Sequence, residues 1–207
     1  MDEMWYTFAT GFIISALGSV PFGVINLTII QITLNSGQKA AFQFVGIALV
    51  AEYFHVWLAI LLFNYIQQYA FVNQYFDWAA IVFILAMAFG SLTKKPDNAN
   101  QKSKETDKIN ISIWKALSIN FLNPFSIPFW LFFTKYAQNS GWIALHFNGQ
   151  IYCIAATLGA MLTLVGYIFI GRKLAQSLVF TKLNIDKILG WAFVGMALWR
   201  VYWMVFG

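Results

Sequence analysis

The sequence predicts an all-α membrane protein with six transmembrane helices, arranged as two inverted three-helix repeats in which helices one and four are broken. Three observations support this prediction: an apolar composition, six apolar stretches of membrane-spanning length, and prolines inside two of those stretches. Sixty per cent of the 207 residues are hydrophobic and only 10% are charged, whereas a soluble domain carries about 25% charged residues. A water-soluble fold could not cover so much apolar surface, but a lipid bilayer accommodates it.

Six segments meet the requirement of roughly 20 mostly apolar residues for a membrane-spanning helix. They run approximately over residues 5–30, 41–63, 75–92, 113–133, 151–170 and 188–206. The third segment is the shortest, and a five-span alternative would place it at the membrane interface.

Basic residues are concentrated in alternate loops, which indicates an orientation. The loops after the first, third and fifth segments hold all but two of the 13 lysines and arginines, the exceptions being Lys135 and Arg200. Because basic loops remain in the cytoplasm, we expect these loops to be cytoplasmic and both termini to lie outside the cytoplasmic (inner) membrane. We expect no nucleic-acid partner, since the basic residues form no long cationic face with interleaved aromatic side chains.

The polar stretch at residues 94–111 is the natural midpoint of the chain. It separates a first repeat, residues 1–93, from a second repeat, residues 112–207, within a single transporter domain. A unit with three spans, duplicated in tandem, must insert in opposite orientations, as in many secondary transporters. The two halves show no convincing residue-by-residue repeat, so the inversion is inferred from the topology.

Proline and glycine interrupt the first predicted span. Pro21 removes a backbone donor and Gly23 tolerates non-helical angles, so we expect the helix to open and leave backbone groups unpaired within the membrane. Asn26 adds a side-chain amide one turn further along. Such groups persist in a bilayer only where they line a cavity or meet protein partners. The alternative is a structural kink that binds no ligand.

The fourth predicted span contains a matching interruption. Pro124 and Pro128 lie four residues apart and cannot both occupy an undisturbed helix. Asn120, Asn123 and Ser126 accompany them, and the two amides, three residues apart, are expected to share a helical face. A broken helix in each half is the best sequence indication of a binding site near the membrane midplane. A pair of structural kinks is again the alternative.

Glu52 and His55 lie three residues apart in the otherwise apolar second span, so they share a helical face. A charged residue at membrane depth costs about 2.5–3.5 kcal/mol on insertion scales, which makes it a functional hypothesis by default. Histidine exchanges protons near neutral pH. We therefore expect this pair to carry a coupling proton. The alternative is a neutral glutamic acid that serves packing, hydrogen-bonded to His55 or to a carbonyl of the first span.

Catalytic and cofactor motifs are absent from the sequence. It contains no HExxH, GxSxG or P-loop motif and no pair of CxxC motifs. We therefore expect neither an enzyme nor a bound metal or cofactor. Without a P-loop, the chain cannot drive transport by hydrolysing ATP itself.

Three stretches follow the pattern of a known family. They are Pro-Phe-Gly-Val at 21–24 followed by Asn-Ser-Gly-Gln-Lys-Ala-Ala at 35–41, Asn-Phe-Leu-Asn-Pro at 120–124, and Leu-Asn-Ile-Asp-Lys-Ile-Leu-Gly at 183–190. They resemble, in this order, the Pro-Gly-Pro turn and Gly-basic-Ala loop, the Asn-Pro motif, and the start of the last span of the LysE/RhtB-type amino-acid exporter superfamily. The resemblance covers nearly the whole chain. Val24 stands where the family's second proline is expected.

The resemblance implies a secondary active exporter of amino acids or similar small metabolites, driven by an ion gradient. With Glu52 and His55 in the second span, we expect the ion to be a proton. The expected partners are a small-molecule substrate and the lipid bilayer, and a homo-oligomer is left open. Two alternatives stand beside this prediction. One is a divalent-cation exporter, which would need several carboxylate, His or Cys ligands facing one cavity, and the other is a membrane assembly factor that transports nothing.

Overall fold

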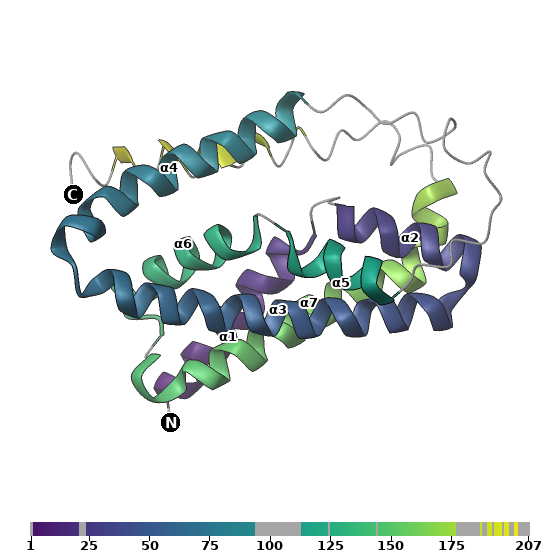
Figure 1. The fold of residues 1–207 in the computed structure, drawn as a ribbon, viewed down its shortest axis with the longest axis horizontal. Coiled ribbons are helices and arrows are strands. Elements are labelled where there is room, and N and C mark those ends of the chain that lie inside the picture. Colours follow the sequence, from purple (N-terminus) through teal and green to yellow (C-terminus); the bar gives the residue numbers. More distant parts are fainter. Residues whose placement is uncertain are drawn as a thin grey trace. The chain divides into compact units, whose positions relative to one another are not determined.

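The computed structural model describes residues 2–20, 24–93, 113–123, 125–143 and 145–176, together with parts of 187–202. All regular structure in the described residues is helical, which confirms the predicted all-α class (Figure 1). The helices are α1 (Asp2–Gly18), α2 (Val24–Ser36), α3 (Gln38–Gln67), α4 (Ala70–Thr93), α5 (Ile113–Phe121), α6 (Ser126–Asn139) and α7 (Leu145–Gln176).

The chain forms two compact units. Unit 1 comprises Met1–Tyr65 and Thr106–Gln176, and unit 2 comprises Ile66–Glu105 and Ser177–Gly207. Within unit 2, the C-terminal segment packs on α4, since a Cβ at Gly190 would lie 2.5 Å from Cγ of Leu92 and 3.2 Å from the carbonyl oxygen of Ala88. Each unit therefore takes a segment from each half of the chain.

Two helices are long and apolar enough to cross a membrane, namely Gln38–Gln67 and Gly149–Ile170. A third span results if α5 and α6 count as one, because this pair passes the same test with a bend of 41° at its break. These helices correspond to the predicted second, fifth and fourth spans. The apolar part of α4 described here, Ile81–Gly90, is shorter. The six-span arrangement as inverted repeats stays a prediction.

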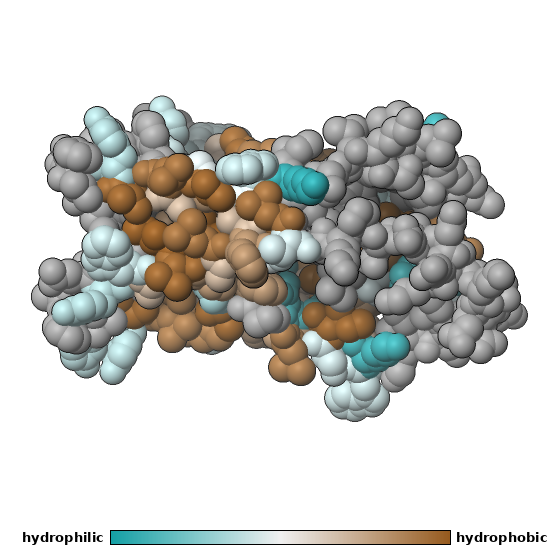
Figure 2. All heavy atoms as spheres, turned by 90° about the horizontal axis from the view of Figure 1, so that it is seen from above, coloured by the Kyte–Doolittle hydropathy of each residue, from teal (hydrophilic) through white to brown (hydrophobic). Residues whose placement is uncertain are grey.

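Large apolar side chains are exposed on the described surface. Figure 2 shows hydrophobic residues gathered on the face in view. On α1 and α7, Leu17, Leu162 and Phe169 are each more than half exposed. Soluble monomers rarely expose large contiguous apolar patches, whereas a surface that faces lipid is apolar. This surface is typical of a multi-pass membrane protein.

Two buried clusters form the core of unit 1, and α3 and α7 contribute to both. The first cluster comprises Ile29, Ile30, Ile32, Ala41, Phe44, Val45, Ala48, Ala116, Leu164, Tyr167 and Ile168. The second comprises Val56, Ala59, Ile60, Phe63, Trp130, Ala137, Ile143, Tyr152, Cys153 and Ala156. The start of α3 thus packs with the later part of α7, and the later part of α3 packs with the start of α7. The two helices therefore run antiparallel. The middle of α3, which carries Glu52 and His55, lies between the clusters.

Helix α1 packs closely against α7 at Gly159. A Cβ at this position would overlap the carbonyl oxygen of Phe12 and lie 2.9 Å from the amide nitrogen of Ala16. Only glycine permits such an approach between two backbones. Four residues further along α7, the Thr163 hydroxyl donates a hydrogen bond of 2.9 Å to the carbonyl oxygen of Ala16. These contacts hold α1 in place just before it ends at Gly18.

Candidate functional site

The first predicted span is interrupted at the expected place. Helix α1 ends at Gly18 and α2 begins at Val24, with a turn and a non-helical residue at 19 and 20. Pro21 and Gly23, on which the prediction rested, lie outside the described residues.

Side chains donate hydrogen bonds to two carbonyl groups at this interruption. The Asn26 Nδ2 amide donates a hydrogen bond of 2.8 Å to the carbonyl oxygen of Ser19. The Tyr167 hydroxyl donates one of 2.6 Å to the carbonyl oxygen of Val20. Asn26 is buried, and in this conformation its amide stabilises the break itself.

The fourth predicted span is interrupted between Phe121, the last residue of α5, and Ser126, the first residue of α6. Pro124 lies outside the described residues. Pro128 does not disturb α6, because it falls in the first turn, where a backbone N–H has no intrahelical partner to lose. The two prolines do not share an undisturbed helix, as expected, since the span is broken before Pro128.

The two amides near this break have separate roles. The Asn120 Nδ2 amide donates a hydrogen bond of 2.8 Å to the carbonyl oxygen of Ala116, and its Oδ1 is buried without a partner among the described residues. The Asn123 Oδ1 accepts a hydrogen bond of 3.2 Å from the amide nitrogen of Phe125. The prediction that both amides share a helical face was wrong, because α5 ends between them.

The Glu52 carboxylate joins the two interrupted spans. Its Oε1 accepts a hydrogen bond of 3.0 Å from the Trp130 Nε1 of α6 and one of 3.5 Å from the Ser15 hydroxyl of α1. Ser15 lies in the last turn of α1 and Trp130 in the second turn of α6, so both donors adjoin a break. The end of α1 and the start of α6 also lie in direct contact, since a Cβ at Gly18 would lie 2.5 Å from the Phe129 ring.

His55 binds the other side of the break in the fourth span. Its Nε2 lies 3.3 Å from the carbonyl oxygen of Phe121, and Nε2 must be the donor because a carbonyl only accepts. The Nδ1 atom is buried and has no partner in the described part of the chain. In a neutral imidazole this nitrogen carries a lone pair. It can therefore take up a proton while the bond to Phe121 persists.

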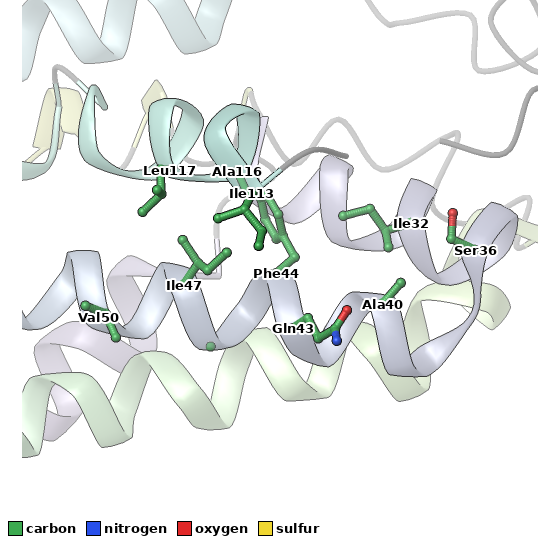
Figure 3. A pocket seen from close by; sticks show the side chains of 11 residues that line it. Ile32, Ser36, Ala40, Gln43, Phe44, Ile47, Val50, Ile113, Ala116 and Leu117 are labelled. Carbon is green, nitrogen blue, oxygen red and sulfur yellow. The ribbon is translucent and has the colours of Figure 1, made fainter. Parts of the chain in front are cut away.

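A groove of about 540 Å³ lies among α2, α3 and α5 (Figure 3). Most of its lining is apolar, with Ile32, Phe44 and Leu117 as examples. Helix α3 contributes a face that includes Val50. Glu52 follows Val50 by two residues, which is roughly 200° around a helix. The groove therefore lies on the opposite side of α3 from the Glu52 site and is a separate feature.

No group of three or more His, Cys, Asp or Glu side chains is placed to hold a metal ion within the described residues. Such a group is the ligand set that the cation-export alternative would require.

Sequence reasoning missed the partners of Glu52. Trp130 had no distinct signal, because it lies three residues from the end of the predicted fourth span, where tryptophan is common at the membrane interface. Ser15 had a weak signal, as a polar residue in an apolar stretch shortly before the break. Their contacts with Glu52 cross 78 and 37 residues of sequence, which local patterns do not reveal.

Replacement of Trp130 by phenylalanine should destabilise the protein by at least about 1–3 kcal/mol, because the acceptor on Glu52 loses its donor and part of the buried indole volume is lost. Thermal unfolding in detergent micelles measures this loss. Trp142→Phe is the matched control, since the Trp142 side chain is exposed. Equal stability of the two variants would show that the indole–carboxylate hydrogen bond contributes nothing.

The helical fold, the apolar surface and two interrupted spans that meet at a carboxylate are typical of membrane transporters. Residues 16–202 match the family model described as LysE type translocator, and the chain belongs to this family. No curated protein and no solved structure matches the chain. The chain is therefore a multi-pass membrane translocator of the class that exports amino acids and other small molecules, a class of transporters rather than enzymes.

Proposed function

We propose that this translocator exports amino acids or similar small metabolites across the cytoplasmic membrane in exchange for protons. The observation that carries the proposal is the position of Glu52, whose carboxylate accepts hydrogen bonds from both interrupted spans. An ionisable group within a membrane span is costly and is usually retained for ion or substrate movement. Glu52 lies near the middle of the 30-residue helix α3, at roughly 20 Å from either end.

Protonation of Glu52 weakens the hydrogen bonds that connect the two interrupted spans. Hydrogen bonds to a charged acceptor are roughly twice as strong as neutral ones, so a proton on the carboxyl group weakens the bonds from Ser15 and Trp130. The end of α1 and the start of α6 are then less tightly held to α3. His55, with its unpartnered Nδ1 among the described residues, serves as a second proton acceptor on the same face. A proton that binds from outside and leaves to the cytoplasm completes one cycle.

The solute would bind beside the same breaks. Helix α6 begins without a side-chain cap, and the partial positive charge at a helix N-terminus attracts a carboxylate. The buried Asn120 Oδ1, unpartnered in the described residues, is suited to accept a hydrogen bond from an ammonium group. The proposed pathway comprises Pro21, Gly23, Asn26, Asn120, Asn123, Pro124, Ser126 and Pro128.

The proposed topology has six spans in two inverted repeats, with basic loops in the cytoplasm and both termini outside. The composition of the two units supports this layout. Unit 1 contains about the first two thirds of each predicted repeat, and unit 2 contains the remainder of each. This division is expected if the two repeats have equivalent structures.

Efflux from proteoliposomes tests the function. Vesicles that contain the purified protein would be loaded with each of the twenty labelled amino acids, and efflux measured with and without a pH gradient that is acidic outside. We expect at least one amino acid to leave faster when the gradient is present. A folded protein that moves none of them would overturn the proposal. Gradient-dependent movement of a divalent cation alone would favour the cation alternative, and no transport at all would favour an assembly role.

A further inference from the structure

Beyond Glu52, helices α6 and α7 enclose polar side chains that the proposed function does not use. The Thr134 Oγ1, the Gln138 Oε1 and the Tyr152 hydroxyl are buried and have no hydrogen-bond partner within the described residues. Thr134 and Tyr152 are both fully buried. Buried polar groups nearly always have a partner, which is either protein or ordered water. The Thr134 and Tyr152 hydroxyls are close enough to interact with each other, but such a pair still leaves one O–H without an acceptor, and the Gln138 Oε1 adds an acceptor without a donor among the described residues. These groups therefore point to a ligand that forms hydrogen bonds.

These groups lie in a row that begins at Glu52. Trp130, Thr134 and Gln138 are spaced by four residues along α6, so they follow one side of the helix over about 12 Å. Trp130 donates its hydrogen bond to Glu52 at one end of the row. Tyr152 packs edge-on against Trp130, with ring centroids 5.8 Å apart, and its hydroxyl lies next to that of Thr134.

The other end of the row reaches the end of α6. Gln138 precedes the last residue of this helix, and the turn that follows, residues 140–142, is exposed. In the proposed topology this turn faces the outside, the side from which an exporter driven by protons would take them up. The row thus connects the carboxylate within the membrane to an aqueous surface.

We propose that Thr134, Gln138 and Tyr152 bind a short file of water molecules that carries the coupling proton between the outer surface and Glu52. This inference rests on the proposed function. Hydrogen-bonded oxygens lie about 2.8 Å apart, so the two hydroxyls and a few waters span the 12 Å.

The proton balance of this step is simple. One proton enters from the outer water, each hydroxyl or water passes one proton on and receives another, and the Glu52 carboxylate becomes a carboxylic acid. Gln138 orients water without exchanging protons, and the single N–H of Trp130 remains bound to Glu52. Titratable side chains near this row in sequence are Tyr53 and His55 on α3, Lys135 and Tyr136 on α6, and Cys153 on α7.

The rate at which Glu52 gains a proton tests the inference without any transported solute. The protein in lipid nanodiscs would receive a rapid drop in pH while the C=O stretch of the protonated carboxyl is followed by infrared spectroscopy. The Glu52→Gln variant identifies the band. In Thr134→Val and Tyr152→Phe we expect the same final band but a rate at least about tenfold lower, which corresponds to a barrier higher by about 1.4 kcal/mol.

Matched controls separate this effect from a general loss of hydroxyl groups. Thr33→Val removes a hydroxyl bound to its own helix, and Tyr136→Phe removes one from α6 outside the row. Both should keep the wild-type rate. Gln138→Leu is a third test variant should either of the first two fail to fold.

The outcomes distinguish the water file from the transport proposal. Wild-type rates in the folded row variants would overturn the file while leaving Glu52 as the proton site. A carboxyl band that does not change at any pH would overturn both the file and the proton-coupled function. Slower protonation in the row variants, together with no efflux of any amino acid, would support the file and reject the exporter.

Discussion

Glu52→Gln should abolish the stimulation of efflux by a pH gradient while leaving exchange of labelled for unlabelled solute in place. Glutamine keeps an oxygen that accepts hydrogen bonds from Ser15 and Trp130, so it resembles the protonated side chain but cannot release a proton. A coupling free energy of about 1.4 kcal/mol corresponds to a tenfold effect, and we expect gradient-driven efflux to fall at least about tenfold. Efflux and exchange from the same proteoliposomes measure the two activities separately.

Glu3→Gln is the control for this substitution, because Glu3 is an exposed acid near the start of α1. It should retain the full response to the gradient. Gradient-driven efflux at the wild-type rate in Glu52→Gln would remove Glu52 from the coupling mechanism.

Gly159→Ala should produce the largest loss of stability among single methyl additions on α7. The new Cβ would overlap the Phe12 carbonyl and press on the Ala16 amide, and neither is the flexible end of a side chain. Overpacking costs typically about 1–3 kcal/mol, and here the separation of α1 from α7 also strains the hydrogen bond from Thr163 to Ala16. Thermal unfolding in detergent, together with the yield of monodisperse protein, measures the effect.

Gly166→Ala supplies the comparison from the same helix. A Cβ at Gly166 meets no heavy atom of the described residues within 4 Å, and alanine is favoured over glycine within a helix by about 0.5–1 kcal/mol. We therefore expect a neutral or slightly stabilised variant. The interpretation of the α1–α7 contact would be wrong if both alanines had the same effect.

The sequence was sufficient to predict the helices of the second, fourth and fifth spans and the approximate positions of the two breaks. Long apolar stretches are recognised from their hydropathy, and a proline such as Pro124 from its missing N–H. Both signals lie within the segment itself and need no knowledge of the helices that pack against it. Glu52 and His55 stood out for a similar reason, since few residues with ionisable side chains occur within an otherwise apolar span.

The side chains that surround the site were not predictable in the same way. Trp130 and Ser15 reach Glu52 from other helices, and Tyr167 binds the break in the first span from α7. These contacts depend on the packing of α1 and α6 around α3. The prediction for Asn123 failed for a local reason, because α5 ends before it and the side chain binds the amide nitrogen of Phe125 instead.

The interleaved units also go beyond what the sequence indicated. The polar loop at 94–111 suggested two halves that follow one another along the chain, whereas each compact unit draws on both halves.

Proton movement caused by a solute gradient is the most direct test of proton exchange through this site. Proteoliposomes would carry a pH-sensitive dye inside, an outward gradient of the transported amino acid and no initial pH difference. As solute leaves, we predict that wild-type vesicles become acidic inside and that vesicles with Glu52→Gln do not. Solute efflux from wild-type vesicles at constant internal pH would contradict the account.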